Sequence, residues 1–347
     1  MLIQIIAFLL MYETYVAFNP DQVYCPEDKK PETSASNIVF QSVDGGQTWQ
    51  DASAGLPKDM YVHNIYASSG EVYLSYANGM YRSSTMSAAP KWEKEIFLNE
   101  SVSNIFPGKS GPYAHSYESG LFQKLSGTGV WITVYKVLKD KIVRTVLEIQ
   151  DGIVLVGCDN GIFKSSDEGK TWKQVLDDVM VTSIVMSESV LIGGSSKGLL
   201  RSEDGGEHWD LVLTKDGSTR KTCLIDGHFV TISNGVRAWN DDIDDPDGKE
   251  NRLRISEDGG KTWQRMDENL SPFRYIYQLE AKQSPYRVIN DIEQAGEYIF
   301  CSLENGIFRS SDHGKTWNLV LPSNSDQVFI LAVSAKVIYA VKVFTGC

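Results

Sequence analysis

The sequence has few of the features that mark nucleic-acid-binding or metal-binding proteins. Positive charge is scarce, since 33 Lys and Arg residues face 45 Asp and Glu residues and leave a formal net charge of −12. A surface this acidic repels phosphate backbones, so we expect no nucleic-acid partner. Only five cysteines occur, and no two stand at metal-ligand spacing, which leaves a zinc site unsupported. Glycine loops that cradle phosphates are also missing, and we expect no cofactor.

Long apolar runs are equally scarce. The run Leu2–Tyr12 is too short to span a bilayer and suits the core of a signal peptide, with Ala17 as a possible cleavage point. The positive charge that usually precedes such a run is absent, and a disordered apolar tail is the alternative. We predict a signal peptide over residues 1–18, a linker over 19–36 and a folded domain over 37–347. The mature protein would have no integral membrane span and would be secreted, periplasmic or on the cell surface.

Tryptophan recurs at a regular interval along the rest of the chain. Successive members of the series lie about forty residues apart, with the last two intervals longer, a spacing typical of propellers and solenoids. The series is Trp49, Trp92, Trp131, Trp172, Trp209, Trp263 and Trp317. Each period has four short alternating runs, as in residues 143–176. A pair such as Asn160-Gly161 follows the second run, where we expect a turn with positive φ at both central residues. Four antiparallel strands per period, repeated radially, predict an all-β, seven-bladed β-propeller.

The ends of the chain predict how the ring closes. Residues 329–344 supply two strands, and residues 38–50 supply a third and a fourth strand with no partners before them. Together they complete one blade, which leaves no exposed sheet edge. A disulfide between Cys25 and Cys347 would lock this closure in an oxidising compartment, and we state it as a hypothesis.

The pattern Ser-x-Asp-x-Gly-x-Thr-Trp occurs five times, and His208 replaces the threonine in one copy. Asp and Ser side chains can hold a tight turn by accepting backbone hydrogen bonds, and Gly permits positive φ. The tryptophan brings a large apolar ring to the contact between blades. We expect a structural role for Ser42, Asp44, Gly46, Trp49, Ser165, Asp167, Gly169, Trp172, Ser202, Asp204, Gly206, Trp209, Ser256, Asp258, Gly260, Trp263, Ser310, Asp312, Gly314 and Trp317.

These five copies resemble the Asp box, also called the bacterial neuraminidase repeat, and the resemblance covers Ile38–Cys347. The box occurs in sialidases, in some endoglucanases acting on plant glucans, in the sortilin ectodomain and in photosystem II assembly propellers. The resemblance implies that the box is structural and lies on the face opposite the ligand site. The chain lacks the Arg-Ile-Pro stretch of sialidases, so their arginine site does not carry over. It also lacks the ten blades and cysteine-rich module of sortilin.

Two links between predicted strands are long, and both belong to the face opposite the boxes, over residues 237–252 and 267–287. Insertions gathered on one face of a repeat protein often mark its binding face. The first link carries Asp242, Asp244, Asp245 and Asp247, which suggest either a calcium loop or a solvated acidic hairpin, and their spacing fails the EF-hand pattern. The second link carries residue types enriched at binding hot spots, although half of them could simply pin the loop. These candidate ligand-binding residues are Phe273, Arg274, Tyr275, Tyr277, Tyr286 and Arg287.

Carboxylates near strand ends on that same face are compatible with the alternative hypothesis that the protein is an enzyme. Retaining glycosidases need two carboxyl groups close together, and the candidates are Glu118, Asp159, Asp291 and Glu304. We nevertheless predict a non-catalytic binding propeller that recognises a protein or glycan through this face. The alternatives are a glycoside hydrolase with an atypical carboxylate pair and an assembly or scaffold factor for a membrane complex.

Overall fold

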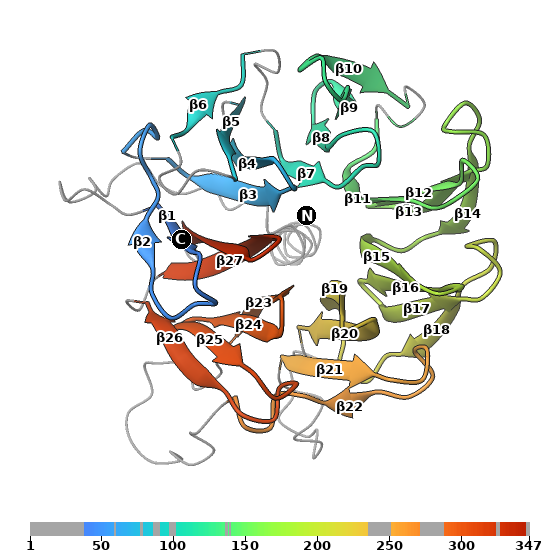
Figure 1. The fold of residues 1–347 in the computed structure, drawn as a ribbon. Helices are drawn as coiled ribbons and strands as arrows, with labels where there is room; N and C mark the ends of the chain where they lie inside the picture. Colours follow the sequence, from blue (N-terminus) through green and yellow to red (C-terminus); the bar gives the residue numbers. More distant parts are fainter. Residues whose placement is uncertain are drawn as a thin grey trace, which may run out of the picture. The chain divides into compact units, whose positions relative to one another are not determined.

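The structure of the chain is a computed structural model that describes residues 38–58, 60–76, 79–85, 91–96, 102–135, 138, 140–234, 251–270, 288–323 and 327–344. These residues form seven four-stranded antiparallel sheets and no α-helix. The sheets are arranged as blades around a central axis (Figure 1). The predicted all-β, seven-bladed propeller is confirmed.

Each blade contains four strands, ordered from the axis outward. The innermost strands are β3 (Val62–Ala67), β7 (Asn104–Phe106), β11 (Val143–Glu148), β15 (Val181–Ser187), β19 (Thr219–Ile225), β23 (Ile289–Ala295) and β27 (Gln327–Ser334). The second strands are β4 (Glu71–Tyr76), β8 (Tyr113–Ser116), β12 (Val154–Cys158), β16 (Val190–Ser195), β20 (His228–Ser233), β24 (Tyr298–Leu303) and β28 (Val337–Phe344). The third strands are β5 (Gly79–Ser84), β9 (Gly120–Lys124), β13 (Gly161–Ser165), β17 (Gly198–Ser202), β21 (Arg252–Ser256), β25 (Gly306–Ser310) and β1 (Val39–Ser42). The outer strands are β6 (Glu93–Lys94), β10 (Trp131–Val134), β14 (Lys173–Asp177), β18 (Asp210–Leu213), β22 (Gln264–Arg265), β26 (Asn318–Pro322) and β2 (Gln50–Asp51).

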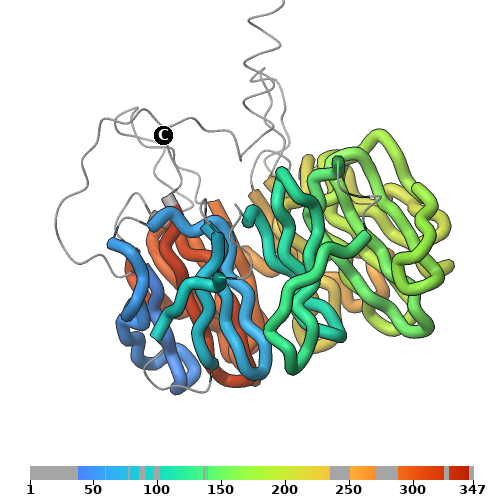
Figure 2. The backbone as a smooth tube through the Cα atoms, turned by 90° about the horizontal axis from the view of Figure 1, so that it is seen from above, coloured from blue at the N-terminus to red at the C-terminus, as the bar shows by residue number. Residues whose placement is uncertain are grey.

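We number the blades along the chain. Blade 1 is β3–β6, blade 2 is β7–β10, blade 3 is β11–β14, blade 4 is β15–β18, blade 5 is β19–β22 and blade 6 is β23–β26. The closing blade has the order β2-β1-β28-β27, so the two ends of the chain share one sheet. Phe40 of β1 pairs with Ala340 of β28, and Figure 2 shows the first and last strands side by side. The predicted closure from both ends of the chain is confirmed.

The core consists of seven apolar clusters, one between each pair of neighbouring blades. Alternation along the strands explains this layout, because successive side chains point to opposite faces of a sheet and both faces of every blade are covered. Between blades 3 and 4, for example, Leu155 and Ile162 pack with Leu191 and Leu200. No single centre holds the molecule together, since each blade is stabilised by its two neighbours.

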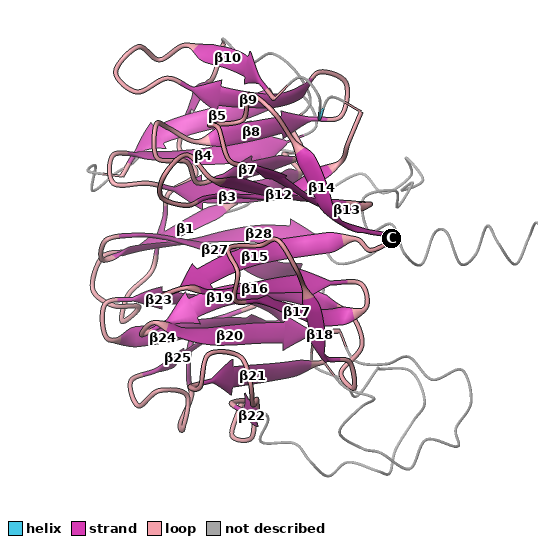
Figure 3. Cartoon of the chain, turned by 90° about the vertical axis from the view of Figure 1, so that its right-hand side faces the viewer, coloured by secondary structure: helices cyan, strands magenta, loops and turns pink. Residues whose placement is uncertain are grey.

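The turns divide the propeller into two faces, which Figure 3 shows edge-on with the strands running between them. We call the face with the turns between third and fourth strands the box face. The link face carries the turns between second and third strands and the links from one blade to the next. On the link face, Gly161 has a φ of 132°, and a Cβ there would stand 1.9 Å from the carbonyl oxygen of Leu176. Asn160 does not share this positive φ, so the expectation of positive φ at both turn residues was wrong. The glycine alone is needed because the outer strand passes so close.

Candidate functional site

The five copies of the repeated pattern form one hydrogen-bonded device on the box face. In the closing blade, the Ser42 hydroxyl donates to Asp44 Oδ1 at 2.9 Å and accepts from the Gly46 amide at 2.8 Å. Asp44 Oδ1 also accepts from the Thr48 amide at 3.0 Å, and its Oδ2 accepts from the Thr48 hydroxyl at 2.6 Å. The other four copies repeat this set. Both oxygens of every box carboxylate therefore serve the turn.

The same bonds keep the box carboxylates ionised. Hydrogen bonds from the Thr48 hydroxyl and amide lower the pKa of Asp44 from 3.8 to about 2. Threonine bonds of the same kind lower the pKa of Asp167 and of Asp312 to about 2. In the variant copy, His208 Nδ1 lies 2.6 Å from Asp204 Oδ2, and the His208 backbone and side chain lower the pKa of Asp204. Saturated, ionised carboxylates of this kind offer no general acid.

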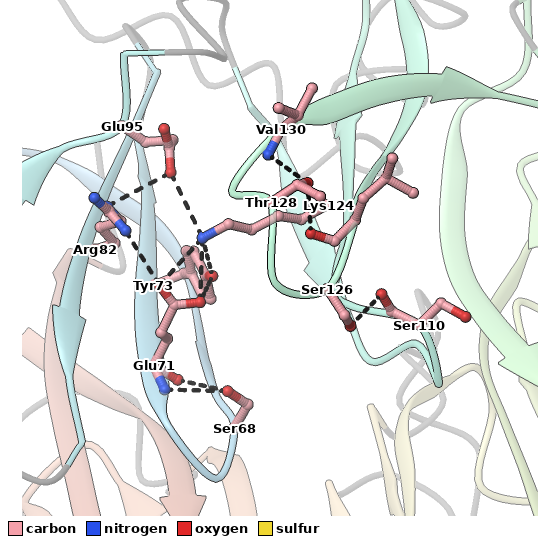
Figure 4. Close-up of polar contacts among 11 residues, drawn as sticks. Ser68, Glu71, Tyr73, Arg82, Glu95, Ser110, Lys124, Ser126, Thr128 and Val130 are labelled. Atoms are coloured by element: carbon pink, nitrogen blue, oxygen red, sulfur yellow. Dashed lines mark hydrogen bonds and ion pairs between the residues drawn. The ribbon is translucent and has the colours of Figure 1, made fainter.

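Blades 1 and 2 lack the box, and a polar cluster occupies their contact instead (Figure 4). The buried Lys124 ammonium of blade 2 lies 3.1 Å from Glu71 and 2.8 Å from the Tyr73 hydroxyl, both in blade 1. It also lies 3.9 Å from Glu95, and Arg82 bonds to Glu71 at 3.2 Å. The Tyr73 hydroxyl donates to Glu71, and desolvation together with that carboxylate raises the pKa of Tyr73. A phenol with a raised pKa is a poor nucleophile, so the cluster joins two blades rather than forming a reactive site.

The link face has a different repeated feature, a bulge near the start of the inner strand. Five inner strands contain one residue more than their partners at this point, namely β3, β11, β15, β19 and β23. Bulges re-aim side chains and are common next to active sites. The extra residues are all polar: His63, Arg144, Thr182, Arg220 and Asn290. The inner strands surround the axis in Figure 1, and we call these five residues the bulge ring.

Arg220 is the most open cation of the bulge ring. Its side chain is exposed, yet surrounding protein still lowers the pKa of its guanidinium by desolvation, and the Asp291 carboxylate opposes that shift. An exposed but desolvated side chain is expected inside the central channel of a propeller rather than on an open surface. Among the described residues, no hydrogen bond or ion pair engages Arg220.

Lys221, the residue that follows Arg220 in β19, bonds to two carboxylates of blade 6. Its ammonium lies 2.5 Å from Asp291 Oδ1 and 2.6 Å from Glu293 Oε1. Asp291 Oδ1 also accepts from the Ile292 amide, and its Oδ2 accepts from the Leu331 amide at 2.7 Å. Burial raises the pKa of Glu293. Burial alone would lower the pKa of Lys221, but the Asp291 and Glu293 carboxylates outweigh it and raise that pKa overall. Lys221 and Glu293 were not among the predicted residues, although Lys221 holds the position in blade 5 that Asp291 holds in blade 6.

The four predicted catalytic carboxylates are distributed over blades 2, 3 and 6. Asp291 is buried at the start of β23, where its carboxylate accepts hydrogen bonds from Lys221, Ile292 and Leu331. Glu118 and Asp159 follow the second strands of blades 2 and 3, where both are exposed. Glu304 follows the second strand of blade 6. By their places in the strands, all four lie toward the link face.

The predicted ligand-binding and metal-binding residues lie outside the described residues. Residues 273–287 fall in the link between β22 and β23, and residues 242–247 fall in the link between β20 and β21. The proposed Cys25–Cys347 disulfide lies outside the described residues as well. Within the described ranges, no group of three or more His, Cys, Asp or Glu side chains could hold a metal ion. The described part of the chain also contains no helix that is long and apolar enough to span a membrane.

Comparison with known proteins identifies the repeat. The BNR-Asp box repeat matches residues 162–175 and 307–320, and the BNR/Asp-box repeat matches residues 254–265. These ranges contain or overlap the boxes of blades 3, 6 and 5. The boxes of blade 4 and of the closing blade make the same hydrogen bonds without a match. No curated protein matches the sequence.

Solved structures share the fold at low identity. The GH74 xyloglucanase from Xanthomonas campestris is 14% identical with a TM-score of 0.54, covering 80% of this chain and 47% of its own. The extracellular domain assigned to a one-component system of B. thetaiotaomicron is 10% identical with a TM-score of 0.56, covering 83% of this chain and 39% of its own. YCF48 bound to D1 peptide is 17% identical with a TM-score of 0.53, covering 83% of this chain and 95% of its own.

This chain therefore spans less than half the length of the first two proteins and nearly the whole of the third. At these identities the likeness establishes the fold and leaves the activity open. The repeat matches and the ring of four-stranded blades agree with each other, and the chain is a seven-bladed β-propeller that carries BNR/Asp-box repeats.

Proposed function

We propose that this protein is a non-catalytic binding propeller that recognises a protein or a glycan through its link face. The observation that carries the proposal is the bulge ring, because five inner strands each place one extra polar residue at the same level of the propeller. A bulge interrupts the ladder and costs pairing, so its repetition with polar residues alone favours a use beyond packing.

The charges of the bulge ring favour a ligand with an anionic group. Two of its five members are arginines and none is acidic, although the chain as a whole is strongly acidic. Arg220 is exposed and without a described partner, and a guanidinium binds a carboxylate by paired hydrogen bonds. A carboxylate on a peptide or an acidic sugar would meet this requirement. The candidate residues Phe273, Arg274, Tyr275, Tyr277, Tyr286 and Arg287 stay a prediction for the rim of the same site.

The comparisons and the N-terminal segment support a location outside the cytoplasm. One protein of the same fold is the extracellular domain assigned to a one-component system, and another is bound to a peptide. We therefore propose that this protein is exported, as residues 1–18 suggest, and acts outside the cytoplasm. Binding a segment of a membrane-complex subunit, as an assembly or scaffold factor, is a special case of this proposal.

A binding screen with matched variants tests the proposal. The labelled full chain is applied to arrays of glycans and of acidic peptides, beside Arg220→Ala and the control Lys170→Ala, whose exposed lysine lies on the box face. We expect at least one ligand that binds the parent and the Lys170→Ala variant but binds Arg220→Ala about tenfold more weakly, as the loss of a charged hydrogen bond predicts. Ligands that bind both variants equally would place recognition elsewhere.

A second function deserves a test because Asp291 and Glu293 lie so close together. Both contact one ammonium within 2.6 Å, so the two contacting oxygens are at most about 5 Å apart, which is close enough for the carboxyl pair of a retaining glycosidase. The raised pKa of Glu293 also suits a general acid. Against this, Asp291 already accepts three hydrogen bonds from Lys221, Ile292 and Leu331. If the parent protein hydrolyses fluorogenic glycosides and Glu293→Gln abolishes this turnover, the protein is a hydrolase and the non-catalytic proposal is overturned.

A further inference from the structure

The boxes of neighbouring blades are connected by basic side chains that precede the box serine. Arg201 of blade 4 donates from Nε to the Gly259 carbonyl in the box of blade 5 at 2.7 Å. Arg309 of blade 6 donates to the Gly45 carbonyl in the box of the closing blade at 2.7 Å. Lys164 of blade 3 reaches Glu207 in the box of blade 4 at 2.7 Å. The same position in blades 3, 4 and 6 therefore sends a cation to the next box.

Blade 5 breaks this series, because Ile255 precedes its box serine. The register confirms the equivalence, since Ile255 pairs with the first residue of the outer strand, as Arg201 and Arg309 do. The acceptor that a cation would reach is the carbonyl of His313, which follows Asp312 as Gly45 follows Asp44. Within the described residues, no hydrogen bond reaches this carbonyl.

A groove of about 480 Å³ opens where the basic side chain is missing, between blades 5 and 6 on the box face. Ile255 lies in its lining, together with the His313 segment of the next box. Cross-blade hydrogen bonds brace the groove: Asn269 donates to the Lys315 carbonyl at 2.8 Å, and His313 Nδ1 lies 3.0 Å from Asp226 Oδ2. The groove is thus preformed by bonds between the two blades, which lowers the ordering cost of binding.

The groove has an excess of negative charge. Asp226, Glu257 and Glu268 line it, and all three are exposed. Neither glutamate has a partner among the described residues. Arg265 is already paired with Asp267 at 3.3 Å, and Asp226 is bonded to Gln294 and His313. Lys315 is then left against the two glutamates. A cation that enters the groove would therefore gain both the open carbonyl and uncompensated carboxylates.

We propose that this groove binds the side chain of an arginine presented by a partner protein, in the place that Arg201 and Arg309 fill at the adjoining blade contacts. The apolar part of the arginine side chain would lie over Ile255, and its guanidinium would donate to the His313 carbonyl and to Glu257 or Glu268. This site lies on the box face and is independent of the function proposed for the link face.

The test uses the full chain and the peptide acetyl-Gly-Arg-Gly-amide, with its citrulline counterpart as a neutral isostere. Ligand-observed NMR titration should give binding of the arginine peptide at least about tenfold tighter than that of the citrulline peptide. The exposed double variant Glu257→Gln/Glu268→Gln should lose about that same factor. Equal affinity for the two peptides, or no binding of either, would overturn the proposal.

A filled groove gives an independent check. In Ile255→Arg the protein's own arginine should occupy the site, abolish binding of the peptide and raise Tm, because the missing connection between boxes is restored. The control Leu319→Arg adds the same charge on the exposed outer strand of blade 6 and should leave peptide binding unchanged. Peptide binding that persists in folded Ile255→Arg would place the arginine elsewhere.

Discussion

His115 is a buried histidine whose hydrogen bonds connect blade 2 to the link before blade 3. Its Nδ1 lies 2.8 Å from the Ser103 hydroxyl, and its Nε2 lies 3.1 Å from the Lys141 carbonyl. A carbonyl only accepts, so Nε2 carries the proton and the neutral ring satisfies both partners. Desolvation by burial lowers the pKa of His115 from 6.5 to about 4. The folded protein therefore holds His115 in its neutral form at neutral pH.

This lowered pKa predicts a pH dependence of stability. The unfolded chain binds a proton at His115 below pH 6.5, whereas the folded chain does so only near pH 4. The free energy of unfolding therefore decreases as pH falls from 6.5 to about 4. The full effect is about 3 kcal/mol. We expect urea unfolding of His115→Gln to show a flatter pH profile between 6.5 and 4 than the parent. An equally steep profile in the variant would assign the effect to other groups.

The box aspartates predict a second, more acidic window. Asp44 has a folded pKa of about 2, below its ordinary value of 3.8, so its stabilising effect is present above pH 3.8 and is lost as pH falls through about 2. Thermal melts between pH 4 and 2 should show a smaller loss of Tm for Asp44→Asn than for the parent. A parallel loss in both proteins would contradict the role of the ionised box.

At the scale of the element, Lys124 shows how a blade contact works without a box. Its ammonium is buried beside Glu71 and the buried Glu95. Removing one partner of a buried charge pair leaves the other uncompensated, so Lys124→Met should lower the free energy of unfolding by about 3 kcal/mol. The double variant Lys124→Met/Glu95→Gln should recover part of that loss in urea titrations. A double variant as unstable as the sum of the single variants would contradict coupling between the two residues.

The sequence predicts the strands well because their signals are local. Alternation, Asn-Gly turns and the repeated box each specify a few adjacent residues, and neighbouring repeats support one another. The bulge ring escapes such reasoning, because a bulge is defined by the pairing of two strands and one extra residue only interrupts alternation. The open groove at Ile255 was within reach, since aligning the boxes places Ile255 where Lys164, Arg201 and Arg309 stand. Its functional meaning required the cross-blade hydrogen bonds.

For the whole molecule, closure of the ring depends on two short strands at the start of the domain. β1 pairs with β28 over four residues and also carries the box whose Gly45 carbonyl receives Arg309. Removing residues 38–51 would expose the edge of β28 and uncover one blade contact. We expect this truncated protein to aggregate or to elute as an oligomer in size-exclusion chromatography, with a lower Tm. A monomer of unchanged Tm would show that closure contributes little.

The central claim is that the link face, around the bulge ring, is where this propeller binds. Hydrogen–deuterium exchange of the full chain with the tightest ligand from the glycan and peptide arrays tests it most directly. We expect slower exchange at the starts of the inner strands, over residues 62–64, 143–145 and 219–221. We expect no change in the box turns of blades 3 and 4, residues 165–172 and 202–209. Protection confined to the box turns would contradict the claim.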